Sequence, residues 1–289
     1  MFKNNKYSKN PIIVSGMPRT ATTIVGKLIS NKAPYSVIYE PFNSSQGLKS
    51  IDMNYLIPGS NIMENDFDRI LDNLLNLNGS FKLGKNKNDS IFKKFIKYTL
   101  GNQSSISFKK AKYFNRNSDV LIKDPFLLFA SEYLSNNYRI IMCERPLLPL
   151  AGSFKRMSWT FHEYNRLLKD LNNIGLDTKN SKKFDDRNIS QFVVGAVQFF
   201  YLYTIFKNRI VGKKNIYFFN QHDLSLYPNN SISSLFDWLN IDYSKKDIDK
   251  IAMSISGSSK NHKSSRDGVQ HDKISVSYTH LTLPTNREV

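Results

Sequence analysis

The sequence predicts a single α/β domain with a central parallel sheet, and three observations support this. Of the 289 residues, 40% are hydrophobic, which is enough to bury a core and excludes a disordered or fibrous chain. Short apolar runs alternate with stretches of helical periodicity, as they do in βαβ units. Each run is apolar almost throughout, as expected of parallel strands covered on both faces. The predicted strands span residues 12–15, 36–39, 120–122, 138–143 and 215–219.

Helices are predicted from apolar residues spaced three and four apart. The first spans residues 22–30 and follows the first strand directly. The clearest pattern lies in residues 189–209, where Phe192, Ala196 and Phe199 fall on one face. The other predicted helices span residues 66–77, 147–172, 231–239 and 246–253.

Composition narrows the classes of partner and compartment. The chain has 41 lysines and arginines against 24 acidic residues, a formal net charge of +17, which favours an anionic partner without saying which kind. The single cysteine, Cys143, excludes a disulfide scaffold and a cysteine-based zinc site. No apolar run approaches the roughly 18 residues of a membrane span. The apolar run at residues 11–16 is too short for a signal peptide, so we expect a cytoplasmic protein.

The predicted domain covers residues 11–275, after a basic tail at residues 1–10. Within it, residues 82–116 hold ten lysines and arginines and one acid, Asp89, with Asn, Ser and Gly between them. This pattern is typical of an insertion or lid. Its simplest interpretation is a solvated, lysine-rich face; the functional alternative is an acceptor groove for an acidic glycan or a flexible lid.

The C-terminal residues 276–289 form a separate segment. Residues 276–285 read VSYTHLTLPT, which can be back-translated into the end of a transposon-based sequencing adapter. We therefore expect residues 276–289 to be an artefactual tail; the alternative is an ordinary strand rich in Thr and Leu. The net charge does not depend on this tail, because Arg287 and Glu288 cancel.

The loop after the first predicted strand has the features of a phosphate cradle. Gly16 ends the strand, residues 18–23 read PRTATT, and a helix follows. Free backbone N–H groups and the dipole of a helix N-terminus favour an anion, and Arg19 adds a cationic fork. The loop lacks the Gly-Lys of a kinase P-loop, and Lys27, a turn further on, is not placed to replace that lysine. The alternative is an ordinary turn with a threonine-rich cap.

A second group of residues follows the strand at residues 138–143. Arg145 lies at the carboxyl end of that strand, and Ser153 lies about two turns into the next helix, so both can reach one phosphate. Pro146 between them suits the start of a helix. Taken alone, this is also the pattern of a generic strand-to-helix turn with a surface arginine.

In this order, the two segments resemble the signatures of sulfotransferases that use 3′-phosphoadenosine 5′-phosphosulfate (PAPS). The first signature reads P-[RK]-[ST]-G-[ST]-[ST], which residues 18–23 match except at Ala21. The second is a strand-end Arg with a Ser eight residues later. The resemblance implies a three-layer, P-loop-like fold with a central parallel sheet flanked by helices, and PAPS as co-substrate. It implies that the 5′-phosphosulfate is held by Arg19, Thr20, Ala21, Thr22 and Thr23, and the 3′-phosphate by Arg145 and Ser153.

The departure at Ala21 has a conformational consequence. If that position needs a positive φ, a Cβ is costly; if φ is negative, Ala fits. The resemblance also extends to the C-terminal basic loop at residues 258–268. It implies that Arg266 and Gly268 close over the 3′-phosphate.

Sulfuryl transfer needs an in-line acceptor, a base and positive charge on the leaving phosphate. Tyr39-Glu40-Pro41 ends the second strand and resembles the [FY]-E-P of carbohydrate sulfotransferases. This implies Glu40 as base and a glycan or glycoconjugate acceptor, although a small-molecule hydroxyl remains open. The alternative for Glu40 is an ion pair with a loop arginine such as Arg19.

A different strand supplies a second candidate base. Cytosolic small-molecule sulfotransferases carry a His in a K-x-H-x-P strand, where this chain reads Lys123-Asp124-Pro125. Asp124 is therefore the second candidate, and Lys123 is expected to steady the departing phosphate. The alternative is that Lys123 and Asp124 only form an ion pair or part of an ion-pair network.

Two other functions stay open at this point, a P-loop-type kinase or phosphotransferase and a basic nucleic-acid-binding protein that uses residues 82–116. No nucleic-acid-binding motif supports the second, so no nucleic acid partner is expected. His162, His222 and His262 lack the spacing of metal ligands, so no metal is implied.

Overall fold

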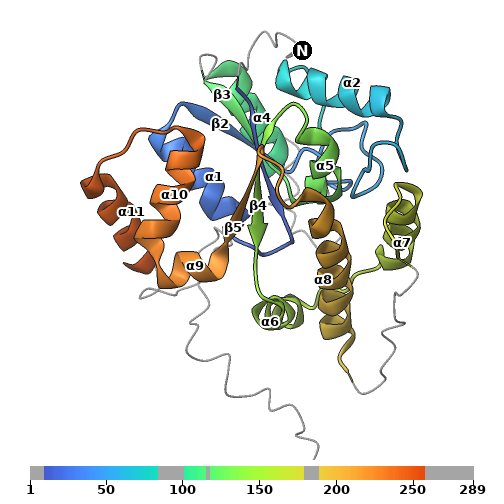
Figure 1. The fold of residues 1–289 in the computed structure, drawn as a ribbon. Coiled ribbons are helices and arrows are strands. Elements are labelled where there is room, and N and C mark those ends of the chain that lie inside the picture. Colours follow the sequence, from blue (N-terminus) through green and yellow to red (C-terminus); the bar gives the residue numbers. More distant parts are fainter. Residues whose placement is uncertain (1–9, 84–100, 115–117, 179–188, 258–289) are drawn as a thin grey trace, which may run out of the picture.

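The computed structural model describes residues 10–83, 101–114, 118–178 and 189–257. Its core is a five-stranded sheet in the order β2-β3-β1-β4-β5, in which all neighbouring strands run parallel (Figure 1). Every end of the predicted strands lies within one residue of the observed end, so the predicted parallel sheet is confirmed. The strands are β1 (Ile12–Gly16), β2 (Tyr35–Tyr39), β3 (Asp119–Lys123), β4 (Arg139–Glu144) and β5 (Ile216–Asn220).

Helices cover both faces of this sheet, which confirms the three-layer, P-loop-like α/β fold (Figure 1). Alternate residues of β1 point to opposite sides: Ile12 and Val14 join one buried cluster, and Ile13 joins the other. The first cluster is covered by α1 (Thr22–Lys32), α9 (Gln221–Leu226), α10 (Pro228–Leu239) and α11 (Lys245–Gly257). The second is covered by α2 (Glu64–Leu75), η1 (Pro125–Ala130), α5 (Ser131–Leu134), α6 (Leu147–Met157), α7 (Tyr164–Asn173) and α8 (Gln191–Ile210).

One predicted helix is divided in two. The prediction of a continuous helix over residues 147–172 was wrong, because α6 ends at Met157 and α7 begins at Tyr164. Ser158 adopts a left-handed conformation with φ of 51°, which closes α6 as a C-cap. The connection that follows carries Trp159 and Phe161 to the cavity described below.

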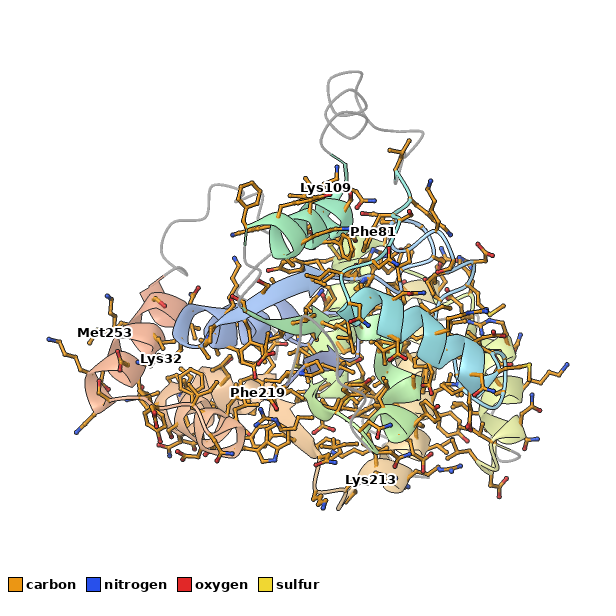
Figure 2. All side chains as sticks on the ribbon, turned by 90° about the horizontal axis from the view of Figure 1, so that it is seen from above. Lys32, Phe81, Lys109, Lys213, Phe219 and Met253 are labelled. Carbon is orange, nitrogen blue, oxygen red and sulfur yellow. The ribbon has the colours of Figure 1, made fainter. Side chains whose placement is uncertain are left out.

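The described part of residues 82–116 contributes a helix to the domain. Helix α4 (Gln103–Tyr113) lies beside the edge strand β2, where the Ser107 hydroxyl accepts a hydrogen bond from the Tyr39 backbone N–H at 3.0 Å. Phe108 is buried in the larger core cluster, whereas Lys109 is exposed on the side of α4 away from the sheet (Figure 2). This segment thus adds to the core as well as to the charged surface, which the sequence pattern did not indicate.

Several predicted features lie outside the described residues. They are most of the basic tail at residues 1–10, the greater part of the basic block, Arg266, Gly268, His262 and the tail at residues 276–289. Among the helices that are described, none combines the length and apolarity that a membrane span needs.

Gly16 is the point at which β1 turns into the first loop, and it gives a test of the fold. Its φ is 145°, and a Cβ there would meet the backbone carbonyl of Cys143 on the paired strand β4. We expect Gly16→Ala to lower the free energy of unfolding by more than about 4 kcal/mol, because backbone atoms of the central sheet cannot move aside. Urea unfolding followed by circular dichroism measures this.

Gly152 offers a matched control within α6. No described heavy atom lies within 4 Å of its Cβ position, so Gly152→Ala should raise stability by about 0.5–1 kcal/mol through helix propensity. Equal effects of the two substitutions would contradict the close approach at Gly16.

Candidate functional site

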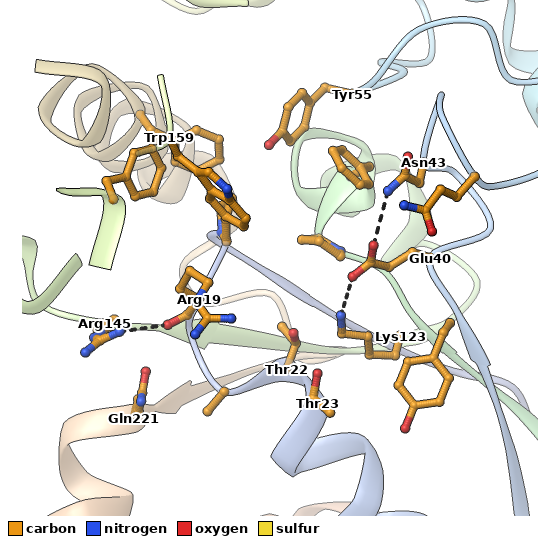
Figure 3. Close-up of a pocket in the computed structure, with 18 of the residues that line it drawn as sticks. Arg19, Thr22, Thr23, Glu40, Asn43, Tyr55, Lys123, Arg145, Trp159 and Gln221 are labelled. Atoms are coloured by element: carbon orange, nitrogen blue, oxygen red, sulfur yellow. Dashed lines mark hydrogen bonds and ion pairs between the residues drawn. The ribbon is translucent and has the colours of Figure 1, made fainter. Parts of the chain in front are cut away.

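The carboxyl ends of the strands open onto one cavity of about 800 Å³ (Figure 3). Its lining comes from the loops that follow all five strands, which is where ligands bind in open parallel sheets. The residues are Arg19, Ala21, Thr22 and Thr23 after β1, Glu40 and Asn43 after β2, Lys123 at the end of β3, Arg145 after β4 and Gln221 after β5.

The first loop places the N-terminus of α1 at this cavity. Thr22 and Thr23 begin the helix and line the cavity, whereas Thr20 is fully buried and donates its hydroxyl to the Met17 carbonyl at 2.6 Å. The N-cap residue of α1, Ala21, has no side chain that can cap the helix, and the first turn of α1 holds no acid. The positive end of the helix dipole is therefore available to an anion in the cavity.

Two loop residues hold a conformation that glycine adopts more easily. Ala21, the N-cap of α1, has a φ of 66°, and Arg19 has the same φ. Because a Cβ in the left-handed region crowds the following carbonyl, each costs about 1–2 kcal/mol. The position where Ala21 replaces the Gly of the signature is thus one that needs a positive φ.

The structure brings Arg19, Arg145 and Ser153 together. Arg145 Nη1 donates to the Arg19 carbonyl at 3.2 Å, and Arg19 Nε donates to Ser153 Oγ at 3.3 Å (Figure 3). Ser153 is fully buried behind Arg19 and does not line the cavity, so its hydroxyl positions the arginine. Burial, followed by the charges of Arg156 and Arg19, lowers the pKa of the Arg145 guanidinium to about 10. A bound anion would offset this repulsion.

Glu40 and Lys123 form an ion pair at the other side of the cavity. Lys123 Nζ lies 2.6 Å from Glu40 Oε1, and Asn43 Nδ2 donates to Glu40 Oε2 at 3.2 Å (Figure 3). The Lys123 side chain is 7% exposed and that of Glu40 is 33% exposed. Glu40 therefore pairs with Lys123 rather than with the loop arginine considered from the sequence, and it retains access to the cavity.

Asp124, the second predicted base, has a different environment. It is fully buried and does not line the cavity. Its Oδ2 accepts from the Phe42 N–H at 2.6 Å, and its Oδ1 accepts from the Phe126 N–H at 2.9 Å. Burial, followed by the charge of Glu40, raises the pKa of the Asp124 carboxyl to about 7, although these two hydrogen bonds lower it. Both carboxylate oxygens of Asp124 accept backbone hydrogen bonds, and only Glu40 lines the cavity. The geometry therefore favours Glu40 as the group that contacts an acceptor.

Several cavity residues were not found from the sequence. Gln221 follows β5, and its buried Oε1 has no hydrogen-bond partner among the described atoms. Its place after a predicted strand was the signal that could have identified it. Lys27 also lines the cavity. A further set, for which the sequence held no signal, forms an aromatic wall with one carboxylate: Tyr55, Phe126, Phe154, Trp159, Phe161, Phe199 and Glu163.

In the described ranges, no three His, Cys, Asp or Glu residues come together in a way that could hold a metal ion.

Comparison with known proteins gives similarity to solved structures alone. No family model matches the chain, and no curated protein sequence matches it. A mouse sulfotransferase, SULT7A1, complexed with PAP is 13% identical, with a TM-score of 0.40 over 89% of this chain and 70% of that one. Sulfotransferase STF1 from Mycobacterium tuberculosis is 12% identical, with a TM-score of 0.41 over 86% and 71%. A sulfotransferase from Alicyclobacillus acidocaldarius is 10% identical, with a TM-score of 0.39 over 87% and 92%.

Because these TM-scores lie below 0.5, the assignment of a reaction has to rest on the residues of the cavity.

The strained N-cap of α1 can be tested directly. We expect Ala21→Gly to raise the free energy of unfolding by up to about 1 kcal/mol, since relief of the left-handed strain exceeds the added entropy of the unfolded chain. Ala111→Gly, at a buried position inside α4, is the control and should lower stability by about 1 kcal/mol. Urea unfolding compares the two; a loss at both positions would contradict the left-handed conformation of Ala21.

Proposed function

We propose that this protein transfers a sulfuryl group from PAPS to the hydroxyl of an acceptor. One observation carries the proposal: the cationic end of the cavity, formed by Arg19, Arg145 and the start of α1, shares one space with the Glu40–Lys123 pair. Residues that the sequence resemblance identified from four separate segments thus line a single cavity. An anionic donor and an acid–base pair in one cavity are what the reaction requires.

The proposed donor site divides between two groups of this chain. Arg145 binds the 3′-phosphate, and Ser153 supports it by holding Arg19. The 5′-phosphosulfate is bound by Thr22, Thr23 and the backbone N–H groups of the first turn of α1. The backbone of Ala21 and the hydrogen bond from Thr20 to Met17 shape this loop. Arg266 and Gly268 are assigned to the 3′-phosphate by resemblance alone. Gln221, which also lines the cavity, is proposed to contact the nucleoside.

The proposed chemistry uses the ion pair. Glu40 accepts the proton of the acceptor hydroxyl as its oxygen bonds to sulfur, and the bond from sulfur to the phosphate oxygen breaks. Lys123 lies between Glu40 and Thr23 in Figure 3, so its ammonium can stabilise the negative charge that develops on the leaving phosphate. The nearby side-chain amide of Asn43 keeps the Glu40 carboxylate oriented.

The proposed acceptor is a glycan, a glycoconjugate or a small hydroxylated molecule. The resemblance of Tyr39-Glu40-Pro41 to carbohydrate sulfotransferases supports a sugar. The aromatic wall favours an acceptor that contains a ring, because the apolar face of a sugar or of a small ring compound can pack on aromatic side chains. A cytoplasmic location stays a prediction from the sequence.

Donor binding can be measured with adenosine 3′,5′-bisphosphate by titration calorimetry. We expect the protein to bind it, and Arg145→Ala to weaken binding by about 10- to 100-fold, because a hydrogen bond between charged groups is lost in a buried setting. Arg69→Ala, an exposed arginine on α2, is the control and should bind normally. Absence of heat with the wild-type protein would overturn the proposal, and binding of ATP that depends on Mg²⁺ would indicate a kinase instead.

The assignment of the base is tested by product analysis. After incubation with PAPS and a panel of glycans and small alcohols, mass spectrometry identifies the sulfated acceptor. We expect Glu40→Gln to reduce kcat at least about 100-fold while nucleotide binding is retained. Glu64→Gln, at an exposed position on α2, should leave kcat unchanged. Full activity of Glu40→Gln would remove Glu40 from the mechanism.

A further inference from the structure

The lining of the cavity is not uniform in charge. Arg19, Arg145 and the N-terminus of α1 form a cationic group, and Lys27 on the same helix also lines the cavity. Elsewhere the lining consists of aromatic rings and the carboxylate of Glu163. The Glu40–Lys123 pair adds little net charge, because its two charges cancel. The proposed donor accounts for the cationic group alone, so the aromatic rings and Glu163 indicate a property of the acceptor.

The aromatic wall is a preformed cluster. Tyr55 packs against Phe126 and Phe199 with ring centroids 5.2 Å and 5.8 Å apart, and Phe161 packs against Phe199 at 4.7 Å. Trp159 is 38% exposed, and the edge-to-face ring of Phe154 supports it at 6.0 Å. In Figure 3, Tyr55 and Trp159 lie across the cavity from Thr22 and Thr23. Such faces attract cations through their π electrons.

The carboxylate of Glu163 lacks an ion-pair partner in the part of the chain that the structure describes. It lies at the N-cap of α7, half-buried, and its Oε1 accepts a hydrogen bond from Asn54 Nδ2 at 3.3 Å. Within the described ranges, Glu163 forms no ion pair. The neighbouring Arg166 directs Nη1 to Asp170 at 2.7 Å and Nη2 to the Asn54 carbonyl at 2.8 Å.

The phenol of Tyr55 lies within reach of this carboxylate. Burial, and then the charges of Glu163, Asp124 and Glu40, raise the pKa of Tyr55 well above its usual range, while the charge of Arg166 lowers it. The carboxylate of Glu163 therefore acts on the centre of the aromatic cluster. An aromatic wall beside a carboxylate that no described residue pairs with is a suitable environment for an ammonium group, which gains from both.

We propose that the acceptor is a hydroxylated amine, whose protonated amino group binds between Glu163 and the aromatic wall. The proposal rests on the proposed function and names its acceptor class, an amino alcohol or an amino sugar. In the proposed binding mode the hydroxyl faces Glu40, which lines the same cavity. A protonated amine has no free electron pair, so pairing with Glu163 directs the sulfuryl group to oxygen: the O–S bond forms, the hydroxyl proton passes to Glu40, and the sulfur–phosphate oxygen bond breaks.

The test uses two pairs of compounds in which the neutral partner has hydrogen in place of the amino group, tyramine with para-ethylphenol and glucosamine with 2-deoxyglucose. Binding is followed by tryptophan fluorescence in a Trp238→Phe background, which leaves Trp159 as the one tryptophan of the chain. Trp238 packs on Tyr217, away from the cavity. Titrations are made with and without adenosine 3′,5′-bisphosphate, and turnover of the same compounds with PAPS is measured alongside.

We expect the amine of at least one pair to bind about tenfold or more tightly than its neutral partner. Glu163→Gln should abolish this preference by raising the KM of the amine. The kcat and the affinity for the neutral compound should change less than about twofold. Glu64→Gln, an exposed carboxylate on α2, is the matched control and should retain the preference.

The outcomes separate the two proposals. The amine proposal would be overturned if both pairs bound equally, if neither amine bound, or if the preference survived Glu163→Gln. Normal nucleotide binding would then leave the proposal of sulfuryl transfer intact. Failure to bind the nucleotide would overturn the proposed function, while amine binding to the free protein would still support the role of Glu163.

Discussion

The candidate site depends on the two backbone hydrogen bonds that the carboxylate of Asp124 accepts. This carboxylate is fully buried, and it accepts one hydrogen bond from the chain after β2, at Phe42, and one from the chain after β3, at Phe126. Glu40 lies two residues before Phe42, and Lys123 directly precedes Asp124. Glu40 also donates its backbone N–H to the Lys123 carbonyl at 2.8 Å. These hydrogen bonds tie the two loops to each other, and the Glu40–Lys123 ion pair lies between the loops that they join.

Backbone strain is concentrated around the same cavity. The described residues include seven that are not glycine and have a positive φ. Leu77, Ser158 and Asn240 lie at or just after the ends of helices, where such a conformation is ordinary. The other four, Arg19, Ala21, Glu40 and Tyr55, all line the cavity. Strain of this kind persists where the surrounding structure enforces it, and it is characteristic of functional sites.

Sequence reasoning succeeded where local chemistry decides structure. The strands could be located because a parallel strand buried on both faces must be apolar throughout. Arg19 and Arg145 could be found because strand ends meet at one edge of a parallel sheet, whereas Glu40 and Lys123 were found through the resemblance to sulfotransferase motifs. It failed at residues 147–172, where a single left-handed serine ends a helix that the periodicity continues.

The aromatic wall could not be predicted for a different reason. Tyr55, Phe161 and Phe199 come from three distant segments, and each has the pattern of an ordinary core residue. Only tertiary packing decides which rings also border a cavity. Glu163 belongs to no sequence motif. What distinguishes it is that no described lysine or arginine forms an ion pair with it, and only the folded structure shows this.

The net charge of the protein and the local charge of Glu163 favour ligands of opposite charge. A net charge of +17 attracts an anionic donor from a distance and repels a cationic acceptor. Salt screens that long-range field within about 8–10 Å, whereas a half-buried carboxylate acts inside this range and with less screening. Glu163 can therefore reverse, within one cavity, the preference that the surface imposes on approach. In the two proposals, the anionic donor is thus attracted by the net charge of the protein and the cationic acceptor by one side chain.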